Sequence, residues 1–249
     1  MRIKSLILIT GLLLSLMAPW LSQAESTAAD IAMAIAAANR SDQDKAQDAG
    51  RKAPEVLGFV GVKTGMTVLD LIAAGGWYTE VLAAAVGPTG KVYAQNPDMV
   101  LKMRDGANDK PMAARLASGR LPNVTRLDKP VQDLGLAAGS LDMVFTSMNW
   151  HDIANNDPAA ASATLEILKG LLKSCGVVGI VDHNGHAGAD NKALHRIEKA
   201  VVIAQAQAAG FTVAESPVLA NPADDLSKGP FDESLRGNTD RFVLRLTKP

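Results

Sequence analysis

Two pairs of neighbouring histidine and aspartate residues carry side chains that can move protons or bind metal ions. His151-Asp152 follows the apolar stretch LDMVFTSMNW, and Asp182-His183 closes the apolar stretch CGVVGIVDH. An imidazole titrates near neutral pH and can act as a general base. Two imidazoles and two carboxylates can instead bind a divalent cation, or brace loops through hydrogen bonds. The sequence leaves these three roles open, with His151 as the preferred base.

A glycine turn is the second feature with chemical potential. The stretch VLDLIAAGGWYTEVLAAAVGPTGKVYAQNP, from Val68 to Pro97, predicts a strand, a turn at Gly75-Gly76, a helix and a second strand. Small residues at such a turn let the backbone approach a nucleotide-like ligand. Two glycines also fit an ordinary strand-to-helix turn. The second strand ends in Gln95-Asn96, where an acid would bind a ribose more strongly than an amide does.

Strands and helices are expected to alternate along the chain, which predicts a doubly wound α/β fold with a mostly parallel sheet. The last two strands have no helix between them, so the sheet should end in an antiparallel strand. Cys175 lies in an apolar stretch and is expected in the core. The expected strands are 67–72, 91–96, 123–128, 141–147, 175–183, 211–219 and 240–249, and the expected helices are 54–59, 78–86, 99–118, 158–172 and 192–209.

One crevice should collect the candidate residues, because ligands of such sheets bind at the carboxyl ends of the strands. His195 is expected in the helix 192–209, away from it. A polar loop of about 20 residues before the last strand is long enough to suggest a function. Arg51-Lys52, near the N-terminus, could cover the site and meet an anionic group. The segments predicted around the crevice are Ile72–Tyr78, Gln95–Asp98, Met148–Asp152 and Asp182–His186.

In their order along the chain, these motifs resemble class I S-adenosylmethionine-dependent methyltransferases. More narrowly, the sequence is similar to a group of exported bacterial proteins identified as methyltransferases from sequence. The resemblance covers nearly all of the chain after its first residues. It rests on the motifs DLIAAGGWYTE (Asp70–Glu80), YAQN (Tyr93–Asn96), NWHD (Asn149–Asp152), VDH (Val181–His183), NPADD (Asn221–Asp225) and RGNTDRF (Arg236–Phe242).

The resemblance implies a seven-stranded Rossmann-like sheet, S-adenosylmethionine as cofactor and methyl transfer to a small or medium-sized acceptor. Three positions depart from the family pattern: Ala74 replaces a glycine, Asn96 replaces the ribose-binding acid, and Pro130 stands where an acid often reaches the adenine. The implied cofactor-binding residues are Asp70, Ala74, Gly75, Gly76, Asn96 and Asn149, and the implied catalytic residues are His151, Asp152 and His183.

The first 24 residues read as a signal peptide rather than as part of the fold. Arg2 and Lys4 precede an apolar run, and Ser22-Gln23-Ala24 supplies small residues at a cleavage site. A membrane anchor is the alternative, although the run is shorter than the ~20 residues that span a bilayer. We expect a periplasmic or secreted bacterial protein with no stable membrane anchor after cleavage. The expected organisation is a signal peptide 1–24, a helical extension 25–60 and a methyltransferase-like domain 61–249.

Composition favours a globular protein, and the resemblance implies a small-molecule substrate. The 249 residues are 47% hydrophobic and 20% charged, with a net charge of −1. A charge so close to zero gives no electrostatic reason to expect nucleic acid or a membrane surface as partner. An exported, non-catalytic ligand-binding protein with the same fold is the alternative function. An NAD-dependent oxidoreductase would need a fuller glycine fingerprint and an acid near Asn96.

Overall fold

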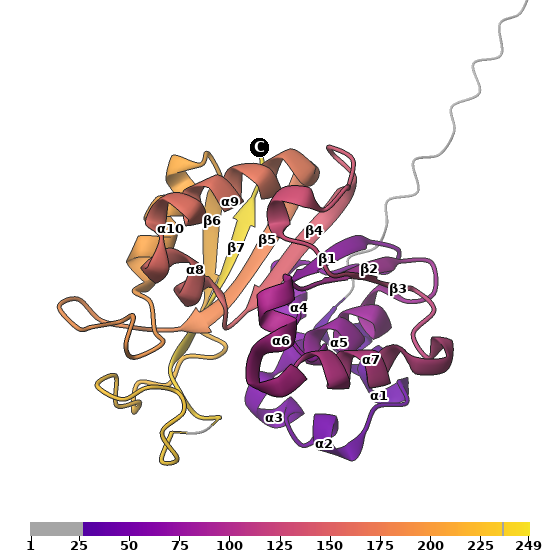
Figure 1. The fold of residues 1–249 in the computed structure, drawn as a ribbon, viewed down its shortest axis with the longest axis horizontal. Coiled ribbons are helices and arrows are strands. Elements are labelled where there is room, and N and C mark those ends of the chain that lie inside the picture. Colours follow the sequence, from indigo (N-terminus) through magenta and orange to yellow (C-terminus); the bar gives the residue numbers. More distant parts are fainter. Residues whose placement is uncertain (1–26, 236) are drawn as a thin grey trace, which may run out of the picture.

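The computed structural model describes residues 27–235 and 237–249. They form a seven-stranded sheet with strand order β3-β2-β1-β4-β5-β7-β6 (Figure 1). Only β7 runs against its neighbours, pairing antiparallel with β5 and β6, so the predicted fold class is confirmed. The strands are β1 (Thr67–Leu71), β2 (Lys91–Gln95), β3 (Val124–Leu127), β4 (Leu141–Ser147), β5 (Leu172–His183), β6 (Thr212–Ser216) and β7 (Arg241–Thr247).

Helices cover both faces of the sheet because successive side chains of each central strand point to opposite sides. Val68 faces one hydrophobic cluster, with α1, α4 and α5, and Leu69 faces the other, with α8, α9 and α10. The helices are α1 (Ala28–Ala37), α2 (Asp42–Lys45), α3 (Asp48–Arg51), α4 (Ala53–Val60), α5 (Trp77–Val86), α6 (Asp98–Gly106), α7 (Asp109–Leu116), α8 (Trp150–Asn156), α9 (Pro158–Leu171) and α10 (Lys199–Ala208), with 3₁₀ turns η1 (Ala117–Gly119) and η2 (Val131–Asp133).

The strand order reverses between β1 and β4. The chain leaves β1 toward β2 and β3 on one side, then crosses back to place β4 on the other side of β1. Loops after β1 and β4 therefore diverge in opposite directions, and they leave a hollow at the carboxyl ends of these two strands. This edge of the sheet holds the candidate site.

The N-terminal helices are part of the packed structure. Thr27 caps α1 through a capping box with Asp30. Ile31 and Ile35 of α1 join the hydrophobic cluster that α4 and α5 share. The division into an extension and a domain stays a prediction, and residues 1–24 lie outside the described residues. In the described part of the chain, every helix is too short or too polar to cross a bilayer.

Two local expectations are wrong. The helix expected from residue 192 begins at Lys199, because residues 190–197 form turns and a bridge from Ile197 to the end of β5. Cys175 is exposed, with a φ of 60°, beside the irregular pairing at the start of β4 and β5. Trp150 begins α8 and is fully buried.

Candidate functional site

A cavity of about 820 Å³ lies at the carboxyl ends of β1 and β4. Its size falls within the range of small-molecule sites, roughly 300–1,000 Å³. Four parts of the chain build it: the turn after β1 with the start of α5, the end of β4, the segment 39–51 that includes α2 and α3, and the segment 111–120 that includes most of α7. Of the six predicted cofactor-binding residues, Asp70, Ala74, Gly75 and Asn149 line the cavity, whereas Gly76 and Asn96 do not.

The turn after β1 is fixed by two amide side chains from the end of β2. The backbone N–H of Ile72 donates to Gln95 Oε1 at 3.0 Å. Asn96 Oδ1 accepts from the N–H of Ala74 at 2.8 Å, and Asn96 Nδ2 donates to the carbonyl of Ala74 at 3.1 Å. Asn96 is fully buried with both amide atoms engaged. The ribose contact predicted for Asn96 therefore does not fit the structure, and this side chain shapes the turn instead.

Left-handed backbone conformations concentrate in this turn. Ile72 and Ala74 have φ angles of 55° and 49°, and Gly76 has a φ of 84°. Positive φ is uncommon outside glycine and is an outlier for a β-branched residue. Such strained residues persist only where surrounding contacts hold them, often at functional sites. Glycine would adopt the conformation of Ala74 at a lower cost.

Gly76 acts through its backbone. A Cβ built on Gly76 would lie 2.9 Å from Met112 Cε and 3.1 Å from Arg115 Cδ. Its positive φ and this close approach leave no room for a side chain. Gly76 thus lets α5 begin directly under α7 while the turn keeps its shape.

Asp70 is the buried acid of the cavity wall. Its Oδ2 accepts a hydrogen bond from Thr79 Oγ1 at 2.6 Å. Burial raises the pKa of Asp70 to about 7, and the hydrogen bond from Thr79 only partly opposes that rise. The carboxyl group can therefore gain or lose a proton near neutral pH. A cation bound beside it would favour the ionised form.

Asn149 joins the ends of two neighbouring strands. Its Nδ2 donates to the carbonyl of Ile72 at 3.0 Å and to the carbonyl of Ser147 at 2.7 Å. Met148, immediately before it, has a φ of 60°, which turns the chain sharply after β4. Asn149 thus closes the floor of the cavity between β1 and β4.

The N-terminal segment supplies the outer wall, including the cation considered from the sequence. The Arg51 guanidinium lies 4.3 Å from the centre of the Trp77 ring, and it donates to Gln47 Oε1 at 2.7 Å. Within the described residues, no carboxylate lies within ion-pair distance of Arg51. Burial lowers the pKa of Arg51, so an anionic ligand would relieve the cost of its charge.

Sequence reasoning missed the ion-pair network that holds this wall. Arg115 of α7 pairs with Asp44 of α2 at 2.7 Å and with buried Glu80 of α5, and its Nε donates to the carbonyl of Gly75 at 3.1 Å. Trp77 Nε1 adds a bond to the carbonyl of Asp44 at 3.0 Å. The partners lie tens of positions apart, so no local spacing signal could reveal them.

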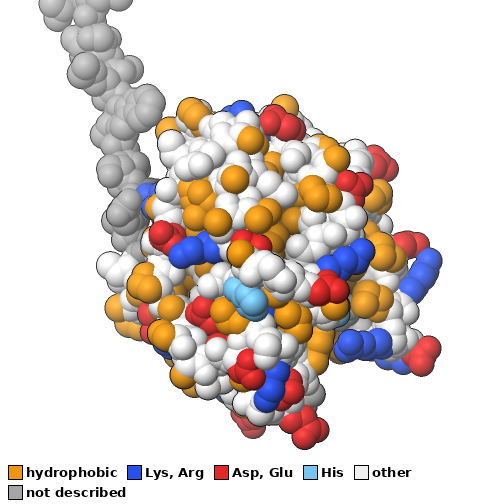
Figure 2. Space-filling model, turned by 90° about the vertical axis from the view of Figure 1, so that its left-hand side faces the viewer, with side chains coloured by type: hydrophobic (Ala, Val, Ile, Leu, Met, Phe, Trp, Pro, Cys, Tyr) orange, Lys and Arg blue, Asp and Glu red, His pale blue; other side chains and the backbone are white. Residues whose placement is uncertain are grey.

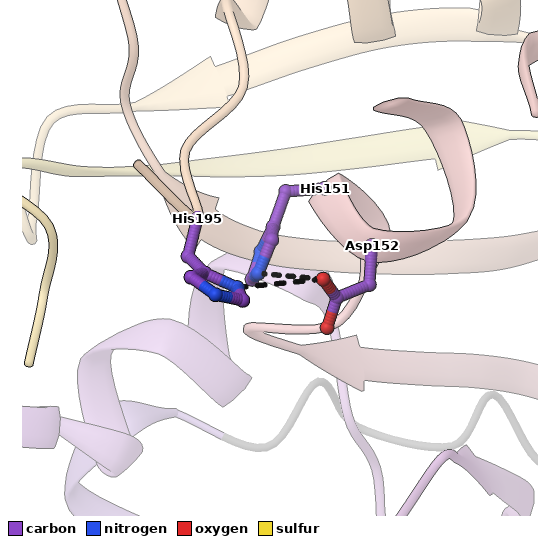
Figure 3. A group of neighbouring side chains, drawn as sticks. All are labelled: His151, Asp152 and His195. Atoms are coloured by element: carbon purple, nitrogen blue, oxygen red, sulfur yellow. Dashed lines mark ion pairs between the residues drawn. The ribbon is translucent and has the colours of Figure 1, made fainter. Parts of the chain in front are cut away.

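A second group of polar side chains lies around the end of β5 (Figure 3). His151 Nδ1 is 2.7 Å from Asp182 Oδ1, and the backbone N–H of His151 donates to Asp182 Oδ2 at 2.8 Å. Asp182 is fully buried and also accepts from the N–H of His183. Burial opposes the charged form of His151, but the bond and charge of Asp182, with the charge of Asp152, outweigh it and raise the pKa of His151.

His195 joins this group, although the sequence placed it on a helix. It lies in the loop before α10 with a φ of 50°. Asp152 Oδ1 lies 3.5 Å from both His151 Nε2 and His195 Nδ1. We call His151, Asp152 and His195 the histidine–aspartate cluster.

His183 is held apart from the cluster. Its Nδ1 is 2.9 Å from Thr239 Oγ1, which ties the end of β5 to the loop before β7. Burial lowers the pKa of His183 to about 4, which leaves the ring neutral at neutral pH. The catalytic role implied for His183 stays a prediction.

The single crevice expected from the sequence is divided into two places. The cavity takes in Ile72–Gly75, Trp77, Tyr78, Met148 and Asn149, but none of the residues 95–98 or 182–186 and neither His151 nor Asp152. His151 nevertheless follows Asn149 by two positions, so the histidine–aspartate cluster begins where the cavity ends.

The polar loop before β7 is anchored by a fully buried ion pair. Arg196 and Asp224 approach to 2.9 Å, and Arg196 also donates to the carbonyls of Asn184 and Lys228. Asp224 in turn accepts from the N–H of Asp240.

On the face shown in Figure 2, acidic and basic side chains are interspersed among hydrophobic and uncharged ones, with histidine atoms near the middle.

Comparison with known proteins finds solved structures of similar fold but no matching sequence family. No family model and no curated protein matches the chain. A SAM-dependent methyltransferase from Aquifex aeolicus is 21% identical, with 79% of this chain and 89% of that chain covered and a TM-score of 0.57. An S-adenosylmethionine-dependent methyltransferase from Mesorhizobium loti is 12% identical, with 78% of this chain and 96% of that chain covered and a TM-score of 0.55.

A third similar structure is described by a different reaction. The [4+2]-cyclase SpnF is 15% identical, with 82% of each chain covered and a TM-score of 0.58. At these identities the similarity establishes the fold, and the reaction has to be argued from the site.

Proposed function

We propose that this protein binds S-adenosylmethionine in the cavity and transfers its methyl group to a small or medium-sized acceptor. The observation that carries the proposal is the cavity itself. It lies where the strand order reverses, under a strained small-residue turn, with the buried acid Asp70 and the half-buried cation Arg51 on its walls. The methyltransferases of similar fold support the same reaction.

Two charged side chains of the cavity wall, Asp70 and Arg51, fit the charged groups of the methionine portion of this cofactor. S-adenosylmethionine carries an ammonium and a sulfonium, both positive, and a carboxylate. Asp70 is suited to the positive groups, and Arg51 is suited to the carboxylate, with charge-assisted bonds in each case. Ala74, Gly75 and Asn149 would contact the bound molecule along the turn and the floor. When bound, the cofactor supplies an electrophilic methyl group, so the protein has to align the acceptor and accept its proton.

His151 is the best candidate to accept that proton. Asp182 holds the Nδ1 side of the ring, which leaves the Nε2 lone pair directed away from Asp182. A base oriented by a buried carboxylate keeps its tautomer and stabilises the imidazolium that forms. Asp152, 3.5 Å from His151 Nε2, would assist through its charge.

Calorimetric titration of the purified protein with S-adenosylmethionine and S-adenosylhomocysteine tests the proposal. We expect one site per chain with a micromolar Kd. Arg51→Gln should weaken binding about ten- to a hundredfold, since a hydrogen bond to a charged group contributes about 1.5–3 kcal/mol. Lys52→Gln is the matched control, because Lys52 is exposed and donates to the carbonyl of Val218 outside the cavity. No heat and no thermal shift at millimolar ligand would overturn the proposal.

A non-catalytic binding protein of the same fold is the second candidate. It is favoured by the separation of the histidine–aspartate cluster from the cavity, and by export away from the compartment where S-adenosylmethionine is made. Binding of the cofactor with the Arg51 dependence described above, but with no methylated product from any acceptor screened, would favour this candidate.

We also infer that the chain is exported, as in the group it resembles, with residues 1–24 removed. The support is the basic start, apolar run and small residues before Glu25. N-terminal sequencing of the protein from a periplasmic fraction should give Glu25 as the first residue. A full-length chain in the membrane fraction would indicate an uncleaved anchor instead.

A further inference from the structure

The histidine–aspartate cluster has the donor set and spacing of a metal site (Figure 3). Its two imidazoles and one carboxylate offer atoms that all lie within 4.8 Å of one another, and Asp152 Oδ1 lies 3.5 Å from a nitrogen of each ring. Zinc bonds of about 2.0–2.2 Å place tetrahedral ligand atoms about 3.4 Å apart. The two imidazole planes are nearly perpendicular, at 89°. Small side-chain rotations would therefore bring all three atoms onto one ion.

The surroundings of His151 match those of a metal-bound histidine. Such a ligand usually gives its other ring N–H to a carboxylate, which fixes the tautomer and the ring orientation. Asp182 takes this place at 2.7 Å from Nδ1, and it is held by two backbone N–H groups, those of His151 and His183. Nε2 is the nitrogen left for a ligand bond, and it is the one that points to Asp152.

Exposure within the cluster is graded from the interior to the solvent. The side chain of His151 is 6% exposed, whereas those of His195 and Asp152 are 44% and 58% exposed. The ring of Phe231 packs edge-on against His195, with centroids 5.2 Å apart. An ion at this place would have a buried ligand behind it and open positions in front, as in metal sites that bind water or a substrate.

We propose that His151, Asp152 and His195 bind a divalent transition-metal ion, with Asp182 as the residue that positions His151. Two histidines and one carboxylate suit Zn²⁺ and other borderline first-row cations. In the metal-bound protein His151 Nε2 is a ligand, so a metal-bound water would replace it as the base. The metal site does not depend on S-adenosylmethionine, and it is tested without it.

The test uses chain produced without a polyhistidine tag and stripped with EDTA. Titration with Zn²⁺ by calorimetry, and with Co²⁺ by visible absorption, should show one ion per chain. His195→Ala and Asp152→Asn should each weaken binding about tenfold or more. His186→Ala is the matched control, since His186 is an exposed histidine outside the cluster whose Nδ1 lies 3.0 Å from the carbonyl of Ala187.

Absence of a stoichiometric site in the unmodified chain would overturn the proposal. So would equal losses in His186→Ala and His195→Ala, which would indicate adventitious binding to surface histidines. Because His195 and Asp152 are partly exposed, circular dichroism of these variants should match the unmodified chain. Titration with S-adenosylmethionine in EDTA reports the cavity separately, so failure of one site is distinguishable from failure of the other.

Discussion

The cavity and the histidine–aspartate cluster adjoin at Asn149 but are built in opposite ways. Around the cavity, polar side chains already bond the turn after β1: Gln95, Asn96 and Arg115 all engage its backbone groups. In the cluster His151 is held through Asp182, and the atoms that face one another are imidazole nitrogens and a carboxylate oxygen. The backbone around the cavity is fixed by hydrogen bonds, whereas the cluster is formed by side chains with few other hydrogen bonds.

Under the proposed function, this contrast separates the residues that bind the cofactor from the candidate catalytic residues. A binding cavity needs a rigid backbone. The left-handed residues Ile72 and Ala74 fit this need, because side chains at the end of β2 hold them in place. Side chains that react or bind a metal ion need free hydrogen-bonding atoms and access to solvent. Each region should therefore respond to different substitutions, and a variant that breaks one should leave the other intact.

The largest effect is expected from Gly76→Val. The new side chain would require a positive φ and would meet Met112 and Arg115, at a combined cost of about 2–5 kcal/mol in unfolding free energy. Binding of S-adenosylmethionine should be lost while Co²⁺ binding at the histidine–aspartate cluster persists. Gly119→Val is the control, because Gly119 has a positive φ of 67° with no atom within 4 Å of the added Cβ. Loss of both functions in Gly76→Val would contradict the separation.

Asp182→Asn tests the opposite side of the comparison. An amide in place of the carboxylate weakens the grip on His151 Nδ1–H, and such second-sphere changes usually reduce metal affinity about 10–100-fold. The visible spectrum of bound Co²⁺ should shift as well, which a purely structural role would not produce. The Kd for S-adenosylmethionine in EDTA should stay the same, because Asp182 does not line the cavity. A parallel loss of cofactor binding would merge the two regions into one.

The affinity for S-adenosylmethionine should increase with pH up to about 7. Below the folded-state pKa of about 7, Asp70 is protonated, and binding a cation beside it requires release of that proton. The affinity should rise by at most about tenfold per pH unit below 7 and level off above it. Asp70→Asn should remove this dependence. A slope that survives in Asp70→Asn would assign it to another group.

The stability of the protein without ligand should follow the reverse trend. The pKa of Asp70 is raised on folding, so between pH 4 and 7 the folded chain binds more protons than the unfolded chain does. This group therefore makes the free energy of unfolding fall as pH rises through that interval and then stay level. Urea denaturation of the unmodified chain and Asp70→Asn at pH 5 and pH 7.5 measures the difference.

The smallest effect is expected from Ala74→Gly. Glycine tolerates the left-handed conformation at this position, so the free energy of unfolding should increase by about 0.5–1 kcal/mol. Ala73→Gly is the neighbouring control, and it should destabilise because no positive φ is relieved there. Thermal melts of both variants would show opposite shifts. Shifts of the same sign would mean that Ala74 is not strained.

Periodicity and strand–helix alternation were sufficient to predict the fold. The strand expected at 141–147 has these bounds in the structure, and the helix expected at 158–172 is α9, which begins at Pro158. Expectations failed where a distant partner decides the local structure. Arg196 is drawn into the interior by Asp224, and the chain around it cannot start the helix at residue 192. For the same reason His195 was not grouped with His151 and Asp152.

The candidate site was predicted in part. Asp70, Ala74, Gly75 and Asn149 were placed at the cavity because sequence motifs mark the ends of β1 and β4. The outer wall was mostly missed, since Asp44 and Arg115 meet only after the N-terminal helices fold back over the turn. Asn96 was misjudged because a buried amide can bond the backbone of its own turn as well as a ligand.

The outer wall of the cavity also bears on the entry and release of a ligand. It consists of two four-residue helices, α2 and α3, fastened by Asp44 to Arg115 and by Trp77 to the backbone of Asp44. Helices this short are not stable alone, so we expect the wall to open by local unfolding. A bound ligand that contacts Arg51 would slow this opening, and the segment would slow release of the ligand. Trypsin cleavage after Arg40, Lys45 and Arg51 should therefore become slower as the cavity fills.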